Sequence, residues 1–144
     1  MQIRAMKTED VDHIEELMKQ LGYPSSVAQL QKRFHKLLNA PGYQTFVAEI
    51  EGDIVGLIGM AKQITYEFDG TYVRVLALVV HEEYRRRNIG QNLMVAAENW
   101  AIENDCKVVT LNSGNREERE AAHKFYEDLG YLGKSTGFLK SLNL

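Results

Sequence analysis

The chain has 144 residues, of which 44% are hydrophobic and 26% charged, and its formal net charge is −3. A chain of this length is expected to fold as one domain, residues 1–144, with a core of its own. The acidic balance argues against a basic field that would attract nucleic acid or a membrane surface. No apolar run approaches a membrane span, and residues 1–10 lack the apolar core of a secretory signal. The single cysteine, Cys106, excludes an intramolecular disulfide, so we expect a cytoplasmic protein.

The first part of the chain is expected to form a short strand and two helices. Residues 3–6 predict the strand, and Thr8 is a capping residue for a helix that Gly22 ends. Ser26 and Gln29 have the spacing of a capping box at the start of the second helix. Apolar residues recur at helical spacing in both: Val11, Ile14, Leu17, Met18 and Leu21, then Val27, Leu30, Phe34, Leu37 and Leu38.

The middle of the chain is expected to form three antiparallel strands. Residues 45–50 and 54–60 flank a turn, and the second of these strands is expected to continue toward Phe68. The pair Asp69-Gly70 is a strong two-residue hairpin signal, and it leads into a long β-rich run, 71–80.

The last part of the chain alternates helices and strands. A helix beginning at Ile89 is followed by a strand at 107–111, a helix at 117–129 and a strand-like tail at 132–142. The strand–helix–strand passage requires parallel pairing with a right-handed crossover. The sequence therefore predicts an α/β (α+β) fold: a mixed, mostly antiparallel twisted sheet with a parallel pair at its centre and helices on both faces.

Three arginines, Arg85, Arg86 and Arg87, stand side by side where a strand is followed by a helix. A helix N-terminus exposes free backbone N–H groups and a partial positive charge, and arginines add bidentate donors for phosphate. Asn88 readily adopts a left-handed conformation, and Gly90 lets the backbone approach a ligand closely. The stretch is therefore built like a cradle for a diphosphate, although three arginines in a loop also suit a solvated surface patch.

Two motifs carry a resemblance to a known family. The stretch VHEEYRRRNIGQNLM, residues 80–94, resembles the pyrophosphate-binding motif of the GNAT superfamily of N-acetyltransferases, Arg/Gln-x-x-Gly-x-Gly/Ala. Arg85 fills its first position and Gly90 its last, whereas Asn88 stands where the family usually has glycine. The stretch AAHKFYEDLGY, residues 121–131, is similar to the family's later helix, A-x-x-F-Y-x-x-x-G-F/Y. The order of the expected elements also matches that fold over nearly the whole chain.

This resemblance implies acetyl-coenzyme A as the co-substrate and a primary amine as the acetyl acceptor, attacking directly in a ternary complex. The pyrophosphate is expected on the arginine loop, and the pantetheine arm is expected to pair with the preceding strand as an added strand would. The residues that the resemblance assigns to the co-substrate are Leu78, Val79, Val80, Arg85, Arg86, Arg87, Asn88, Ile89, Gly90 and Gln91. A backbone N–H near Val80 is expected to donate to the developing oxyanion.

The resemblance assigns Tyr126 as the general acid, because it matches the family tyrosine proposed to protonate the leaving sulfur. The base stays open, since the run 71–80 contains no carboxylate. Four residues are alternatives, each acting through water: Glu49, Glu67, Tyr72 and His81. No metal site is expected, because Cys106 has no Cys or His at short spacing.

The acceptor is expected to be a small amine. The arginine loop and the AHKFY helix are similar to aminoalkylphosphonate N-acetyltransferases, which suggests a small anionic or polar amine. Aminoglycosides, polyamines, amino acids and protein N-termini stay open, and so does a catalytically weak acetyl-coenzyme A sensor. Four tyrosines are candidates to line the acceptor pocket: Tyr23, Tyr43, Tyr66 and Tyr72. Neither nucleic acid nor a membrane is an expected partner, and the family's frequent homodimers leave the oligomeric state open.

Overall fold

The computed structural model describes residues 1–113, 120–134 and 137–143. The chain divides into two compact units, Met1–Thr110 and Leu111–Leu144. The first unit contains β1 (Gln2–Ala5), η1 (Thr8–His13), α1 (Glu15–Leu21), α2 (Val27–Asn39), β2 (Tyr43–Ile50), β3 (Asp53–Ile64), β4 (Thr71–Val80), η2 (Glu82–Tyr84) and α3 (Ile89–Glu103), where η marks a 3₁₀-helix. Strand β5 (Val109–Leu111) spans the boundary, and α4 (Glu120–Asp128) belongs to the second unit.

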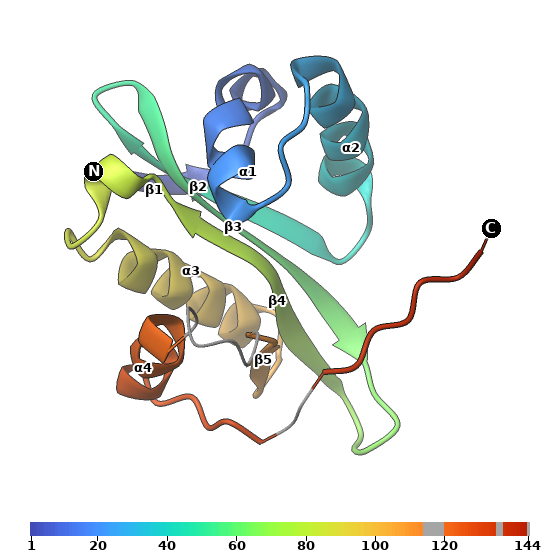
Figure 1. Ribbon diagram of the computed structural model, residues 1–144. Coiled ribbons are helices and arrows are strands. Elements are labelled where there is room, and N and C mark those ends of the chain that lie inside the picture. Colours follow the sequence, from blue (N-terminus) through green and yellow to red (C-terminus); the bar gives the residue numbers. More distant parts are fainter. Residues whose placement is uncertain (114–119, 135–136, 144) are drawn as a thin grey trace. The chain divides into compact units, whose positions relative to one another are not determined.

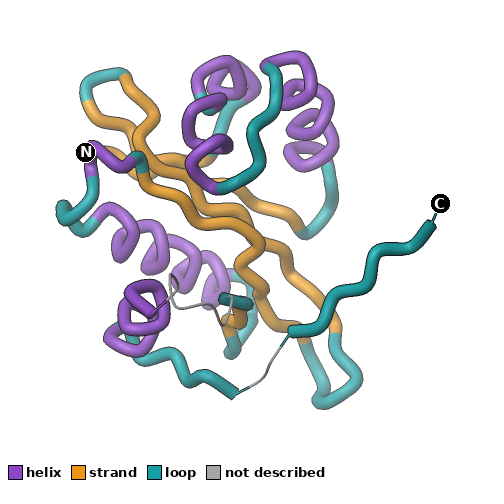
Figure 2. Tube along the Cα trace, viewed as in Figure 1, coloured by secondary structure: helices purple, strands orange, loops and turns teal. Residues whose placement is uncertain are grey.

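The strands form one sheet in the order β1-β2-β3-β4-β5 (Figure 2). The first four pair antiparallel, and β5 adds a parallel pair. The mixed, mostly antiparallel fold predicted from the sequence is confirmed. The parallel pair lies at the end of the described sheet and not at its centre, because the tail forms no strand within the described residues 131–134 and 137–143.

Helices cover both faces of the sheet in the first unit. Figure 1 shows α1 and α2 on one face and α3 on the other. A buried cluster joins η1, α1 and α2 to the sheet: Met6, Val11, Ile14, Leu17, Met18, Leu30, Phe34, Val47, Ile54, Leu57 and Val79. Helix α3 buries Ile89, Leu93, Met94, Ala97 and Ala101 at the spacing expected of one helix face. Burial of each large apolar side chain stabilises the fold by about 1.5–3 kcal/mol.

The first helix differs from its prediction. A 3₁₀-helix runs from Thr8 to His13, and the α-helix begins only after Ile14, which has non-helical dihedrals (φ −117, ψ 8). Lys7, not Thr8, is the N-cap residue, and its backbone N–H donates to Asp10 Oδ2 at 2.7 Å. The carboxylate of Asp10 therefore fixes a tight first turn. The Ser26–Gln29 capping box is confirmed, with reciprocal hydrogen bonds of 3.1 and 2.9 Å.

An ion pair fastens this turn to the sheet. The Arg4 guanidinium donates to both Asp10 oxygens at 2.7 and 2.8 Å and to Glu49 Oε1 at 2.9 Å. Asp10 is buried, with 7% of its surface exposed. The hydrogen bonds from Arg4 hold the pKa of Asp10 below its ordinary value of 3.8. Because Arg4 lies on β1 and Glu49 on β2, the cluster joins three elements.

We expect Asp10→Asn to destabilise the fold by about 2–4 kcal/mol at neutral pH, because it leaves a partly buried guanidinium short of its partner. A depressed folded pKa contributes stability above the unfolded pKa that is lost as pH falls through the folded value. The gap between wild type and variant should therefore shrink below about pH 4, as measured by urea unfolding from pH 7 to 2. Asp12→Asn is the control, since Asp12 is exposed and accepts a hydrogen bond from Gln31, which an asparagine oxygen can also accept. Equal stability of Asp10→Asn and wild type at pH 7 would contradict the assignment.

The turns between strands agree only in part with the sequence. The β2–β3 turn is as expected, with positive φ at Glu51 (49°) and Gly52 (86°). Strand β3 ends at Ile64, so residues 65–70 form a longer loop than the two-residue hairpin expected at Asp69-Gly70. Tyr66 is fully exposed in this loop and does not continue the strand.

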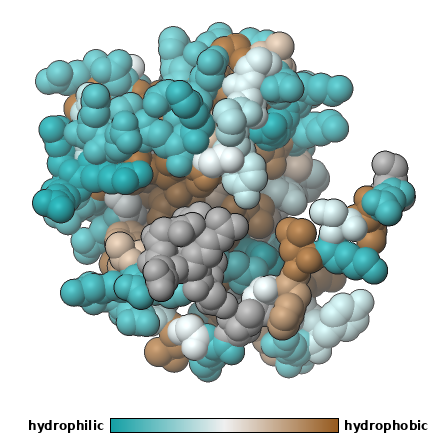
Figure 3. Space-filling view, in the orientation of Figure 1, coloured by the Kyte–Doolittle hydropathy of each residue, from teal (hydrophilic) through white to brown (hydrophobic). Residues whose placement is uncertain are grey.

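The second unit carries the later helix and the tail. Helix α4 lies within the predicted range 117–129, of which residues 117–119 fall outside the described part of the chain, and Gly130 follows with φ 94° as predicted. The described tail exposes Leu132, Phe138 and Leu139. Figure 3 shows hydrophobic (brown) residues among hydrophilic (teal) ones on this face of the protein. A lone strand without a partner is not stable in water, which explains why the predicted tail strand is not formed within the described residues. None of the helices in the described ranges combines the length and apolar character needed to cross a membrane.

Candidate functional site

Strand β4 contains a β-bulge at Leu76. Along its pairing with β3, Gly59 is opposite Ala77 and Met60 is opposite Val75, so Leu76 is an extra residue without a partner. Such a residue locally bends the strand and changes which edge the following backbone groups face. The side chain of Leu76 is 48% exposed, so burial of this side chain does not account for the irregularity.

After the bulge, the backbone of β4 is turned outward at two of the predicted site residues. Before it, Val73 N–H donates to the carbonyl of Val108, away from β3, at 2.9 Å. After it, His81 N–H donates to β3 at 2.8 Å. Because alternate residues face alternate edges, the N–H and C=O groups of Leu78 and Val80 face the edge that β3 does not occupy. Two of the three predicted strand residues therefore offer main-chain groups to an added ligand, whereas the side chain of Val79 is part of the core.

The turn that follows β4 is closed by hydrogen bonds. Glu82 N–H donates to Gln20 Oε1 at 2.9 Å, and Glu83 N–H donates to His81 Nδ1 at 3.1 Å. Tyr84 N–H donates to the carbonyl of His81 at 2.9 Å. Each N–H of η2 therefore has a partner, and the direction in which the chain leaves the sheet is fixed.

The next seven residues, 85–91, contrast with this turn, because their N–H groups have no hydrogen-bond partner among the described residues. Arg86 and Asn88 have positive φ of 64° and 61°, which confirms the left-handed conformation predicted for Asn88. Left-handed residues within a turn can direct successive N–H groups toward one side, as in an anion-binding nest, and we use the name nest for residues 85–91. The first helical bond closes only at Asn92, whose N–H donates to the carbonyl of Asn88 at 3.0 Å. The N–H groups at the start of α3 therefore stay available to an anion.

Three arginines add positive charge to this loop. Arg85, Arg86 and Arg87 are exposed. The Arg87 guanidinium carbon lies 5.0 Å from the centre of the Tyr84 ring, and the Tyr84 ring meets the His81 ring edge to face at 5.8 Å. A cation over an aromatic face is stabilised by the ring quadrupole. The stack thus orients Arg87. The N–H groups of residues 85–91, together with the guanidinium donors, suit the oxygens of a diphosphate.

Buried Ile89 anchors the nest to the sheet, against Gly56 of β3. A Cβ on Gly56 would lie 3.0 Å from Leu93 Cδ1 and 3.2 Å from Ile89 Cγ2. Glycine is therefore required at position 56 because α3 packs close to the strand. A left-handed backbone is not the reason, since Gly56 has no positive φ. A glycine inside an apolar strand signals such close approach, so the sequence contained a signal for this residue.

Gly56→Ala is expected to displace the first turn of α3, destabilise the fold by about 1–3 kcal/mol and weaken anion binding at the nest several-fold. Thermal unfolding and calorimetric titration measure the two effects. Gly59→Ala is the matched control on the same strand, because a Cβ there has nothing within 4 Å. Equal behaviour of the two variants would show that the packing of α3 on Gly56 is unimportant.

Tyr126, the predicted general acid, lies on α4 in the second unit and is half-buried. Its ring contacts the neighbouring rings of Phe125 at 5.1 Å and Tyr131 at 6.1 Å, both edge to face. Tyr131 N–H donates to the Tyr126 carbonyl at 3.0 Å. These contacts fix the ring on its helix, and its role as an acid stays a prediction.

The four alternatives for the base have different surroundings. Glu49 is bound to Arg4, and the Tyr72 hydroxyl donates to Gln63 Oε1 at 2.8 Å. His81 Nδ1 accepts from a backbone N–H, which leaves only its other nitrogen for proton transfer. Glu67 is exposed on the β3–β4 loop. Glu49 is the poorest choice, because its carboxylate already accepts a hydrogen bond from Arg4.

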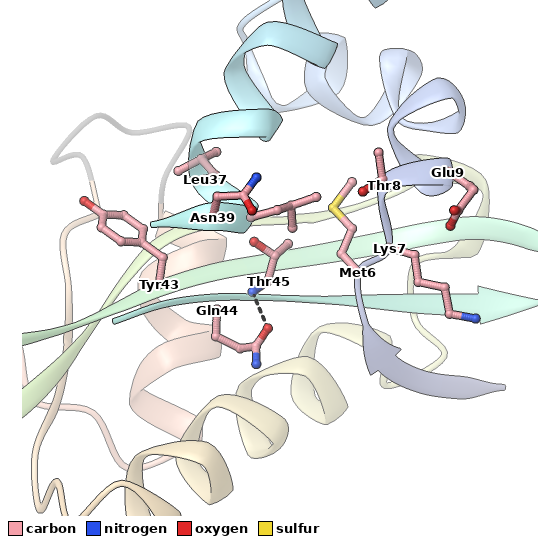
Figure 4. Close-up of a pocket in the computed structure, with 10 residues that line it drawn as sticks. Met6, Lys7, Thr8, Glu9, Leu37, Asn39, Tyr43, Gln44 and Thr45 are labelled. Carbon is pink, nitrogen blue, oxygen red and sulfur yellow. Dashed lines mark hydrogen bonds between the residues drawn. The ribbon is translucent and has the colours of Figure 1, made fainter. Parts of the chain in front are cut away.

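A pocket of about 470 Å³ lies beside the first residues of β2 (Figure 4). It is lined by Met6, Lys7, Thr8, Glu9, Leu37, Leu38, Asn39, Tyr43, Gln44 and Thr45. Across the sheet, Tyr43 is in register with Ala61 and Arg74, and Thr45 is in register with Gly59 and Ala77. Of the four tyrosines expected near the acceptor, Tyr43 lines this pocket, whereas Tyr23, Tyr66 and Tyr72 do not.

Within the part of the chain that the structure describes, no group of three or more His, Cys, Asp and Glu side chains is placed to hold a metal ion. Cys106 is buried, with its sulfur 3.2 Å from Thr71 Oγ1. An anion-binding nest at the start of a helix, beside a strand edge with outward-facing backbone groups, is the arrangement of a protein that holds an extended diphosphate-bearing ligand.

Comparisons with known proteins identify the family. Residues 9–131 match the model of the Acetyltransferase (GNAT) family. A GNAT family acetyltransferase from Staphylococcus aureus is 33% identical, with 98% of both chains covered and a TM-score of 0.85. The chain belongs to the GNAT acetyltransferase family. Acetyl-coenzyme A is the co-substrate of this family, so the enzyme class and co-substrate expected from the sequence are confirmed.

Other solved structures share the fold at lower identity. An aminoglycoside 6′-N-acetyltransferase from Acinetobacter haemolyticus is 17% identical, covers 100% of this chain and 99% of its own, and has a TM-score of 0.85. An aminoglycoside N-acetyltransferase in complex with CoA is 18% identical, covers 99% of this chain and 95% of its own, and has a TM-score of 0.84. The comparison with curated proteins gave no match.

Proposed function

We propose that this acetyltransferase moves the acetyl group of acetyl-coenzyme A to the primary amine of a small molecule by direct attack in a ternary complex. The pyrophosphate binds at residues 85–91, and the pantetheine arm pairs with the outward backbone of Leu78 and Val80. Residues 1–144 act as one domain in this reaction.

The observation that carries the proposal is that the N–H groups at 85–91 have no partner among the described residues and directly follow a strand with outward-facing backbone groups. The diphosphate supplies acceptors for the N–H groups and negative charge for Arg85, Arg86 and Arg87. The amide groups of the pantetheine arm supply the donors and acceptors that an added strand would. Both halves of the ligand are thus matched along one continuous segment of the chain.

The chemistry follows from this placement. The nitrogen of a neutral amine forms a bond to the thioester carbonyl carbon, and a backbone N–H near Val80 stabilises the oxyanion. The carbon–sulfur bond then breaks, the electron pair stays on sulfur, and Tyr126 donates a proton to it. The proton lost by the amine leaves through water. Because positioning supplies much of the rate, no strongly basic side chain on β4 is required.

The acceptor class is proposed on two grounds. The sequence resembles aminoalkylphosphonate N-acetyltransferases in the arginine loop and in the helix that carries Tyr126. Two structures with the same fold are named as aminoglycoside N-acetyltransferases. Both descriptions are of enzymes that acetylate small amines. A third structure with this fold, 17% identical, is named as a ribosomal-protein-alanine N-acetyltransferase, so the choice of a small amine rests on the resemblance of the two motifs.

The experiment is a thiol-release assay with acetyl-coenzyme A and a panel of amines: aminoalkylphosphonates, aminoglycosides, polyamines, amino acids and peptides with free N-termini. We expect turnover with one of the small-molecule classes and an N-acetylated product by mass spectrometry. Turnover with the peptides alone would contradict the small-molecule acceptor while leaving the acetyl transfer intact.

A further inference from the structure

Gln20 is the contact between helix α1 and the turn that leads into the nest. Its Oε1 accepts from Glu82 N–H at 2.9 Å, across 62 positions of sequence. Its Nε2 donates to Glu16 Oε1 at 3.0 Å, one helical turn earlier. The second bond sets the orientation of the amide, so that its oxygen and not its nitrogen faces Glu82.

Helix α1 is a rigid support for this contact. Leu17 and Met18 are buried, and Leu17 packs in the same core cluster as Val79 of β4. The helix ends directly after Gln20 and Leu21, where Gly22 takes φ 109° as C-cap. The side chain of Gln20 therefore projects from a fixed helix end onto the residue that follows His81.

We propose that Gln20 is a positioning residue for coenzyme A, which acts by fixing the turn before the nest; this rests on the proposed function. The N–H groups of Glu83 and Tyr84 are bound by His81, within the turn itself. Gln20 binds the remaining N–H of η2 from a different element, and so ties the turn to the fold. Without it, the turn keeps its bonds to His81 and the packing of Ile89 on Gly56 but loses its tie to α1, so the N–H groups at 85–91 are less well aligned with the strand.

A purely structural role predicts a different result. The hydrogen bond is solvent-exposed, so its loss lowers the melting temperature slightly and leaves ligand affinity unchanged. A positioning role predicts weaker binding of coenzyme A, a raised KM for acetyl-coenzyme A and an unchanged kcat, because Gln20 touches neither the reacting atoms nor the leaving sulfur.

The test is isothermal titration of the full chain with coenzyme A, together with steady-state kinetics. Gln20→Ala is expected to weaken binding about fivefold, the net contribution of one hydrogen bond. The double exchange Glu16→Gln with Gln20→Glu reverses the donor and acceptor within the pair and keeps an oxygen facing Glu82, so it is expected to restore affinity. Glu16→Ala alone should have the smaller effect, because it removes the orienting bond and leaves the bond to Glu82.

The outcomes separate this inference from the proposed function. A wild-type chain that does not bind coenzyme A would defeat the proposed function itself. A wild-type chain that binds, with an unchanged dissociation constant in Gln20→Ala, would overturn the role of Gln20 alone. A lower melting temperature without loss of affinity, or failure of the double exchange to restore binding, would overturn it as well.

Discussion

Replacing Arg86 and Arg87 with alanine is expected to weaken coenzyme A binding by about 10- to 100-fold, the loss of two charge-assisted contacts to an exposed diphosphate. Alanine and arginine are similarly disfavoured at the positive φ of Arg86, so the backbone of the nest is not relaxed by the change. Calorimetry at low and high salt measures the effect. The wild-type affinity should fall with added salt, and the variant should show a shallower dependence, because fewer charges face the ligand.

The matched control removes the same charge elsewhere. Lys32 and Lys36 are exposed on α2, and Lys32→Ala with Lys36→Ala lowers the net charge equally without touching the arginine loop. Coenzyme A affinity should be unchanged in this control. If both double variants bound coenzyme A like the wild type, the arginines would be a solvated patch and not part of the cradle.

Tyr126→Phe is expected to lower turnover by about 10- to 100-fold with little change in either KM, because the hydroxyl acts on the leaving sulfur and not on the bound ground states. Steady-state kinetics with the best amine of the panel measures turnover and both KM values.

Tyr131→Phe is the control for Tyr126. It removes the same hydroxyl from the tyrosine whose ring contacts Tyr126 at 6.1 Å, so a general effect on this part of the second unit would appear in both variants. Unaltered turnover in Tyr126→Phe, in an enzyme whose chemical step is rate-limiting by pre-steady-state kinetics, would remove Tyr126 from the mechanism.

Local signals in the sequence were reliable where neighbours along the chain decide the structure. The Ser26–Gln29 capping box forms as predicted, since its donors and acceptors lie within one helical turn. Asn88 adopts the left-handed conformation, and α3 begins directly after it. The prediction for the start of the first helix was wrong. Asp10 forms an ion pair with Arg4, and the chain there makes a 3₁₀ turn. A capping signal at Thr8 contains no information about a contact with Arg4.

The sequence assigned the end of β4 to the co-substrate as a whole segment. Only the pairing of β4 with β3 shows which of its residues face outward. The motif assigned Leu78, Val79 and Val80 together to the co-substrate. The bulge at Leu76 decides which of them face outward. One extra residue in β4 switches the edge to which each following backbone N–H and C=O group points. Gly56 and Gln20 belong to β3 and α1, and they meet the site only through the packing of α3 and the end of α1.

By itself, the sequence identified the family and most of the order of the elements, and it predicted an anion-binding role for the loop at 85–91, because these depend on residue types at fixed spacing. Only the tertiary structure decided the edge that β4 presents, the position of the parallel pair and the residues that support the nest. The physical reason is that those features depend on register and on contacts such as Gln20 to Glu82, which are 62 positions apart in the chain. Periodicity and local motifs contain no information about which distant residues meet.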